Sequence, residues 1–156
     1  MATVPGCCVI PVDVGILDFP GAPGVLNRRI RNATRDISQG PAMDRTECLR
    51  AVEVGMELVR QQRQNGCQIL LTGEMGIGNT TASSAVVSVL LNLPPEQVTG
   101  RGAGLSNTGL LRKCRAIRQA IASNRPDPDD PIDVLTKVGG LDLAALCGTF
   151  LGGALY

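Results

Sequence analysis

Residues 70–82 read L-L-T-G-E-M-G-I-G-N-T-T-A: a short apolar run, three glycines within six residues, and the polar start of a helix. Such a turn can point backbone N–H groups and the positive end of a helix dipole at an anion, most often a phosphate. Gly73, Gly78 and Thr80 follow the spacing of the ATP-binding loop G-x-x-x-x-G-K-[ST], but Asn79 stands where that loop has lysine. The stretch therefore predicts an α/β strand-to-helix turn that binds a monophosphate without a metal ion.

The composition limits the class of protein. At 156 residues and 44% hydrophobic content, the chain is expected to form one domain over residues 1–156. The 15 basic and 14 acidic residues nearly cancel, which gives no reason to expect a nucleic-acid or membrane partner. Aromatic residues make up only 2%, so the core must be aliphatic, as in a parallel sheet between helices. The lack of histidine excludes Ser-His-Asp and Cys-His catalysis and every histidine-ligated metal site.

The cysteines and the termini indicate a cytoplasmic protein. The six cysteines form no C-x-x-C pair and lie mostly in apolar stretches, so they are expected to be buried and reduced, with no disulfide and no metal. The first residues, M-A-T-V-P-G, lack a leader, and no apolar run has the length of a membrane helix. The cysteines are Cys7, Cys8, Cys48, Cys67, Cys114 and Cys147.

The order of the expected elements is strand, turn and helix, repeated. Strands are expected at residues 8–15, 67–72 and 97–99. The first expected helix runs from a capping box at Asp44 and Glu47 to Asn65-Gly66, and the second covers the apolar positions of residues 82–93. A third is expected from its inner face of Leu110, Cys114, Ile117 and Ile121. A fourth begins at Pro131 after the cap Asp130, and a fifth covers residues 141–154. The order predicts a Rossmann-like α/β fold with a mostly parallel sheet and helices on both faces, truncated at both ends.

A second glycine turn, residues 100–104, follows the third expected strand. Two such turns at the carboxyl ends of successive parallel strands face one crevice, the usual ligand site of open α/β sheets. Arg101 in this turn or Lys113 on the next helix would supply the positive charge that Asn79 does not. The alternative for Lys113 is a solvated helix face. Glu74 is either an exposed turn residue or the acceptor of a ribose hydroxyl.

Four motifs together resemble the nicotinate-nucleotide:dimethylbenzimidazole phosphoribosyltransferase family. They are G-E-M-G-I-G-N-T-T at 73–81, G-P-A-M at 40–43, G-R-G-A-G-L at 100–105 and V-G-G-L-D-L-A-A-L-C-G at 138–148. The resemblance covers nearly all of this chain but only the middle of a family member. It implies an α/β homodimer without a cofactor that transfers phosphoribose from nicotinate mononucleotide to 5,6-dimethylbenzimidazole. The products are α-ribazole 5'-phosphate and nicotinate, in cobalamin lower-ligand synthesis.

The resemblance also implies the site residues. Glu74 and Gly76 would meet the ribose and phosphate, Gly102 would approach the phosphate, and Lys113 would neutralise it. The complete expected ribose and phosphate site is Glu74, Gly76, Gly78, Asn79, Thr80, Arg101, Gly102 and Lys113.

The family's catalytic glutamate belongs to a later glycine-rich segment, so no catalytic residue is expected in this chain and little or no turnover. The alternatives are a non-catalytic module that binds a phosphorylated nucleoside, and a relic that binds nothing. A nucleotide hydrolase is a third alternative. Asn79 argues against it, because a loop without the lysine is expected to show no ATP hydrolysis.

Overall fold

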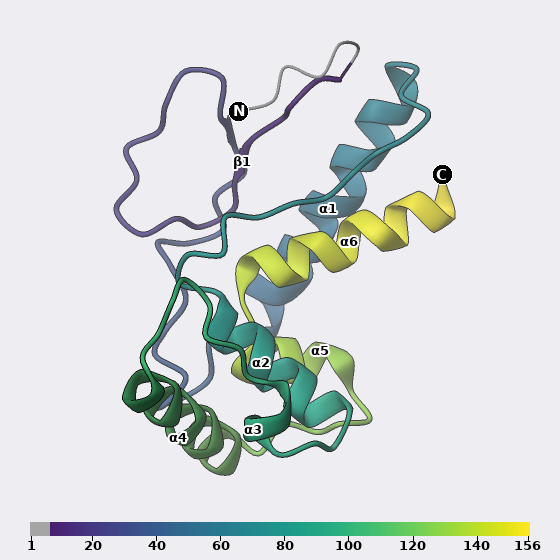
Figure 1. The fold of residues 1–156 in the computed structure, drawn as a ribbon. Helices are drawn as coiled ribbons and strands as arrows, with labels where there is room; N and C mark the ends of the chain where they lie inside the picture. Colours follow the sequence, from purple (N-terminus) through teal and green to yellow (C-terminus); the bar gives the residue numbers. More distant parts are fainter. Residues whose placement is uncertain (1–6) are drawn as a thin grey trace.

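Helices α1 (Arg45–Gln64) and α6 (Leu141–Leu155) pack against each other in the computed structural model, which describes residues 7–156 (Figure 1). Glycines set how closely they approach. A Cβ at Gly148 would lie 1.9 Å from the carbonyl oxygen of Val52, and a Cβ at Gly55 would lie 2.0 Å from that of Ala145. The lack of a side chain at these two positions lets the backbones of the two helices approach closely.

A second group of helices lies beside this pair: α2 (Thr80–Leu90), α3 (Pro95–Val98), α4 (Asn107–Asn124) and α5 (Pro131–Val138) (Figure 1). Their buried cluster includes Ala85 of α2, Ile117 of α4 and Val134 of α5. Leu135, the next residue of α5, belongs instead to the cluster formed by α1 and α6. Helix α5 therefore joins the two groups.

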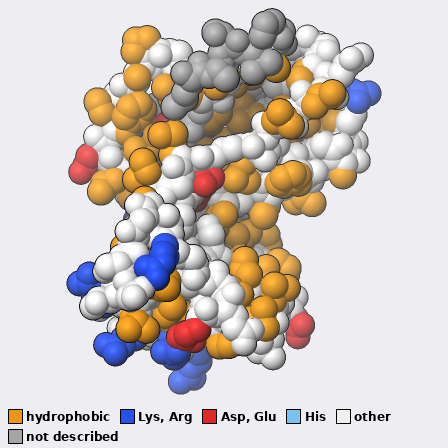
Figure 2. Space-filling view, in the orientation of Figure 1, with side chains coloured by type: hydrophobic (Ala, Val, Ile, Leu, Met, Phe, Trp, Pro, Cys, Tyr) orange, Lys and Arg blue, Asp and Glu red, His pale blue; other side chains and the backbone are white. Residues whose placement is uncertain are grey.

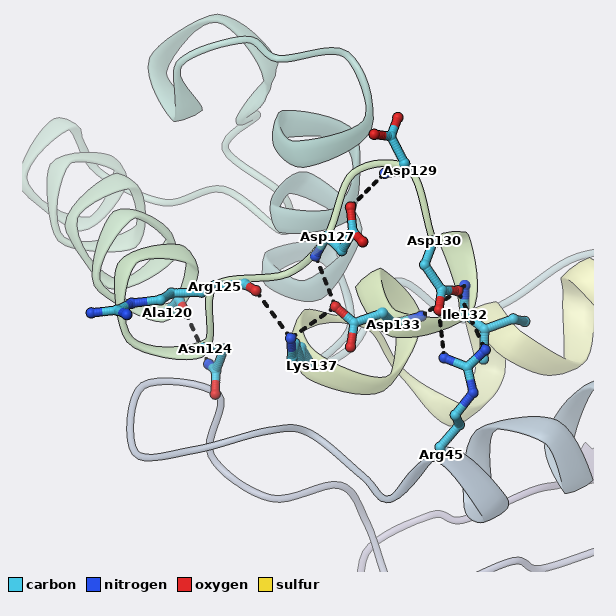
Figure 3. A network of polar contacts seen from close by, with 10 residues as sticks. All are labelled: Arg45, Ala120, Asn124, Arg125, Asp127, Asp129, Asp130, Ile132, Asp133 and Lys137. Atoms are coloured by element: carbon cyan, nitrogen blue, oxygen red, sulfur yellow. Dashed lines mark hydrogen bonds and ion pairs between the residues drawn. The ribbon is translucent and has the colours of Figure 1, made fainter.

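The connection from α4 to α5 is fixed by the polar network drawn in Figure 3. Asp130 accepts hydrogen bonds from the backbone N–H groups of Ile132 and Asp133, as expected for the cap of a helix that begins at Pro131. Its carboxylate also accepts a 2.7 Å hydrogen bond from Arg45, the first residue of α1. The Arg45 guanidinium and these N–H groups lower the pKa of Asp130.

The sheet consists of β1 (Val12–Asp13) and β2 (Leu26–Asn27), which pair in parallel. The mixed α/β class with parallel pairing is confirmed, but the strand expected at residues 8–15 shortens to two residues. Asp13 is buried and forms a 3.1 Å ion pair with Arg29 Nε, which ties the segment just after β2 to β1.

Two strand predictions are wrong. Residues 67–72 run without regular structure and pair with no strand among the described residues, and the expected strand at 97–99 is occupied largely by α3. A strand needs a paired neighbour to satisfy its backbone, whereas Pro95 at the first position of α3 has its backbone angle already set for a helix. The helices expected around residues 44–65, 82–93, 110–121, 131 and 141–154 are confirmed.

The prediction that all six cysteines are buried is also wrong. Only Cys48 and Cys114 are buried. The other four thiols are free and exposed, in segments or on helix faces that nothing in residues 7–156 covers: Cys7, Cys8, Cys67 and Cys147.

Apolar side chains remain exposed along the segment that precedes α2. The exposed fractions are 80% for Ile69, 87% for Leu71 and 78% for Ile77. Figure 2 shows hydrophobic side chains over both ends of the molecule, and most of the visible Lys and Arg side chains gathered at the end where α4 lies. None of the helices in the described part of the chain is long and apolar enough to cross a membrane.

Candidate functional site

Lys113 is the centre of the candidate site. It lies on α4 and is only 8% exposed. Its Nζ donates a 2.9 Å hydrogen bond to Thr80 Oγ1 and a 3.3 Å hydrogen bond to the carbonyl oxygen of Gly100. No carboxylate forms an ion pair with this ammonium in residues 7–156. A buried cation that meets only neutral oxygens leaves a charge to be balanced by an anion.

The N-terminus of α2 meets this ammonium at Thr80. Asn79 occupies the cap position, but its side chain forms no capping hydrogen bond, and the first turn contains no acidic residue. The first N–H groups of an α-helix have no partner within the helix and carry the positive end of its dipole. The lysine and the helix start therefore present positive charge at one place.

The second glycine turn passes directly over this place. Gly102 has a φ of +55°, a conformation that side-chain-bearing residues rarely adopt. A Cβ there would lie 3.2 Å from Thr80 Oγ1 and 3.8 Å from Lys113 Nζ. Glycine at this position lets the backbone approach the lysine and the helix start.

The first glycine turn is organised around a different pair. Glu74 accepts hydrogen bonds from the backbone N–H of Gly76 and from Asn79 Nδ2. The same Asn79 nitrogen donates a 2.7 Å hydrogen bond to Asp142 Oδ2, in the first turn of α6. Gly76 and Gly78 have φ angles of +71° and +80°, which let the chain fold back between Glu74 and α2.

The structure thus brings most of the predicted residues into two adjoining groups that meet where Asn79 precedes Thr80. Arg101 is the exception, because its guanidinium turns toward the start of α4 and donates to Leu105 O at 2.8 Å and to Asn107 Oδ1. The first group contains Thr80, Gly102 and Lys113, and the second contains Glu74, Gly76, Gly78 and Asn79.

Glu74 and the second glycine turn are exposed, so the cluster lies at the surface around the buried Lys113. One hollow of the molecule lies between the arginine-rich segment at residues 28–30 and α1, and another lies between α2 and α4 near Pro94. Neither is lined by any of the eight predicted residues.

Two residues that take part in the site were not predicted from the sequence. Gly100 takes part through its carbonyl oxygen, which no side-chain pattern reveals. Asp142 is 63 residues from Asn79, and the one local signal is an acidic residue just after the Gly139-Gly140 break, in the first turn of a helix.

Chemically, the arrangement can bind an oxyanion at Lys113 and Thr80 and present carboxylate oxygens beside it. Glu74 Oε2 is used within the turn, while Glu74 Oε1 forms no hydrogen bond in the described part of the chain. An anion with a hydroxyl-bearing group attached, such as a sugar phosphate, matches this pairing of charges and acceptors.

Comparison with known proteins places the chain among phosphoribosyltransferases. A relative from Ruminiclostridium cellulolyticum is 52% identical over 95% of this chain and 42% of its own length. A relative from Alkaliphilus metalliredigens is 50% identical over 99% of this chain and 44% of its own length. Both are named nicotinate-nucleotide:dimethylbenzimidazole phosphoribosyltransferase.

The structural comparison agrees. The crystal structure of CobT from Thermus thermophilus has a TM-score of 0.87 and 43% sequence identity, over 96% of this chain and 45% of that chain. The chain spans less than half the length of the relatives it matches. The phosphoribosyltransferase family model DBI_PRT matches residues 1–156, so the chain belongs to this family.

Proposed function

We propose that this chain binds the ribose 5-phosphate part of nicotinate mononucleotide during phosphoribosyl transfer to 5,6-dimethylbenzimidazole. The products are α-ribazole 5'-phosphate and nicotinate, in cobalamin lower-ligand synthesis. The names of the relatives support the reaction, and the buried Lys113 ammonium beside Thr80 and Gly102 is the observation that carries the binding role. We also propose that it acts as a cytoplasmic homodimer without a cofactor or metal.

The phosphate would accept hydrogen bonds from Lys113 and from the N–H groups at the start of α2. Lys113 Nζ uses two of its three donors on Thr80 and Gly100, which leaves one for a phosphate oxygen. Gly102 would contribute backbone beside the same oxygen, and Arg101 would add positive charge at the rim.

The ribose would lie toward the first glycine turn. Glu74 would accept a ribose hydroxyl with Oε1, because Oε2 already holds Gly76 N–H and Asn79. Gly78 would keep the turn tight enough for this carboxylate and the phosphate group to meet one nucleotide.

The proposed transfer depends mainly on how the protein positions the two substrates. The pyridinium of nicotinate mononucleotide leaves neutral without a general acid, so the protein must hold the sugar phosphate and provide one base for the imidazole proton. We assign the base to no residue of this chain, and expect the chain alone to bind the donor substrate with little or no turnover.

Calorimetry with nicotinate mononucleotide tests the binding role, and chromatography of reaction products tests turnover. We expect heat of binding with nicotinate mononucleotide, competition by inorganic phosphate, and no hydrolysis of ATP with magnesium. Absence of heat would contradict the proposed function.

The second candidate function is a non-catalytic module for a phosphorylated nucleoside. It rests on the same contact between Lys113 and Thr80, which would hold a phosphate group whether or not transfer follows. Binding with no product after prolonged incubation would favour the module, whereas conversion at a relative's rate would exclude it.

A further inference from the structure

We propose that Asp142 is a positioning residue, which fixes the Asn79 amide and through it holds Glu74 in the site. The inference rests on the proposed function for its substrate, but not for its geometry. Asp142 lies on α6, outside the set of residues that sequence motifs assign to the ribose and phosphate.

The contacts form a chain from α6 to the glycine turn. Asp142 Oδ2 accepts from Asn79 Nδ2 at 2.7 Å, and the same nitrogen donates to Glu74 Oε2. Among the described residues, this is the one side-chain hydrogen bond that joins residues 73–79 to α6. The turn is therefore held by a helix far away in the sequence.

The two carboxylates decide which way the amide points. An amide nitrogen has two N–H donors, and both are used here, one on each carboxylate. The reverse orientation would put the carbonyl oxygen of Asn79 against two carboxylate oxygens. In the orientation observed, Asn79 Oδ1 is buried without a hydrogen-bond partner, so the carboxylates and not the surroundings of Oδ1 set the orientation.

The Asp142 carboxylate is placed by the start of its own helix. It lies in the first turn of α6, where the helix dipole favours negative charge. A Cβ at Gly140 would lie only 2.4 Å from Asp142 Oδ1, so this position must lack a side chain for the carboxylate to lie where it does. Gly140→Ala therefore displaces the carboxylate without removing its charge.

The experiment compares the intact chain with Asp142→Ala, Asp142→Asn and Gly140→Ala. Hydrogen exchange of the peptide covering residues 73–79, without ligand, reports how firmly the turn is held. Calorimetry with nicotinate mononucleotide measures the dissociation constant of the site. The matched control is Asp133→Ala, which removes a first-turn carboxylate from α5 and not from α6.

We expect Asp142→Ala and Gly140→Ala to speed exchange at 73–79 about tenfold, the size expected for loss of a hydrogen bond to a carboxylate. The dissociation constant should rise by about the same factor. Asp142→Asn, which keeps an acceptor oxygen, should change both less, and Asp133→Ala should change neither.

Two results would overturn the proposal. One is unchanged exchange at 73–79 in Asp142→Ala. The other is faster exchange confined to α6 in Asp142→Ala with wild-type behaviour of Gly140→Ala, which would make Asp142 only a stabiliser of its helix. If the wild-type chain binds no nicotinate mononucleotide, the proposed function fails, while the exchange measured without ligand still decides the role of Asp142.

Discussion

Lys113 Nζ lies 2.9 Å from Thr80 Oγ1, so a buried ammonium on α4 meets the first residue of α2. The pairing places a full positive charge beside the free N–H groups of a helix start. Neither element alone would make a strong anion site, because a lone helix N-terminus carries only a partial charge. Their juxtaposition supports the anion site proposed here.

Replacing this lysine should separate binding from stability. Lys113→Met should weaken the binding of nicotinate mononucleotide and of phosphate at least about tenfold, because the full charge is lost. The melting temperature should stay the same or rise, since an apolar side chain of similar length replaces a buried cation without a counterion. Calorimetry and thermal unfolding measure the two effects. Arg112→Met, at an exposed neighbour on α4, is the control, and equal affinity in Lys113→Met would contradict the assignment.

The contact between α1 and α6 should tolerate no side chain at Gly148. A Cβ there would lie 1.9 Å from Val52 O, so Gly148→Ala must push the helices apart and should lower the free energy of unfolding by about 1–3 kcal/mol. Gly153 on the same helix has nothing within 4 Å of a Cβ, and Gly153→Ala should raise it by about 0.5–1 kcal/mol. Urea denaturation measures both, and equal effects would refute this account of the contact.

The cap of α5 should make the free energy of unfolding depend on pH. The Arg45 guanidinium and the N–H groups of the cap lower the pKa of Asp130 in the folded chain. Stability from this carboxylate is therefore fully present above its unfolded pKa, about 4, and is lost as pH falls through the lower folded value. Asn caps a helix as well as Asp, so Asp130→Asn removes the charge and keeps the cap.

The free energy of unfolding of Asp130→Asn should thus fall below that of the wild type at neutral pH, and the difference should shrink below about pH 4. Urea titrations from pH 3 to 7 measure it. Asp129→Asn, whose carboxylate accepts no hydrogen bond within residues 7–156, serves as the control. A difference that does not change with pH would count against the Arg45 contact.

The thiols should react in three classes. The exposed Cys7, Cys8 and Cys67 should react first with a disulfide reagent. Cys147 is also exposed, but partial desolvation of its thiol on α6 raises the pKa of that thiol and lowers the thiolate fraction, so it should follow more slowly. Cys48, whose pKa burial also raises, should react only on unfolding.

Buried Cys114 should behave like Cys48. Mass spectrometry of the labelled peptides gives the order. Early labelling of Cys48 would mean that the cluster formed by α1, α5 and α6 opens readily.

The helices could be predicted from the sequence because their ends carry local signals. The N–H of Asp44 donates to Glu47 at 2.8 Å, and Asp130 caps the helix that begins at Pro131. Each signal involves residues at most three apart. The strand expected at 67–72 had the right apolar run, but a strand depends on a partner that the run itself does not encode.

The site could be predicted only in part, for the same reason. The sequence predicts the two glycine turns and Lys113 as candidate site residues. The structure shows that Lys113 contacts Thr80, which lies 33 residues earlier in the chain. The contact from Asn79, at the cap of α2, to Asp142 on α6 follows from how the helices pack. The acidic residue in the first turn of α6 is a local signal for that helix, but it does not identify the partner of Asp142.

The exposed apolar segment before α2 has a thermodynamic consequence. Ile69 and Leu71 are 80% and 87% exposed, so a molecule that covers them in the folded chain gains the burial of that surface. Any such molecule stabilises the fold by mass action, by about 2.7 kcal/mol at a hundred times its dissociation constant. The melting temperature of this chain then becomes a measure of what surrounds it, and will rise with the concentration of whatever covers Ile69 and Leu71.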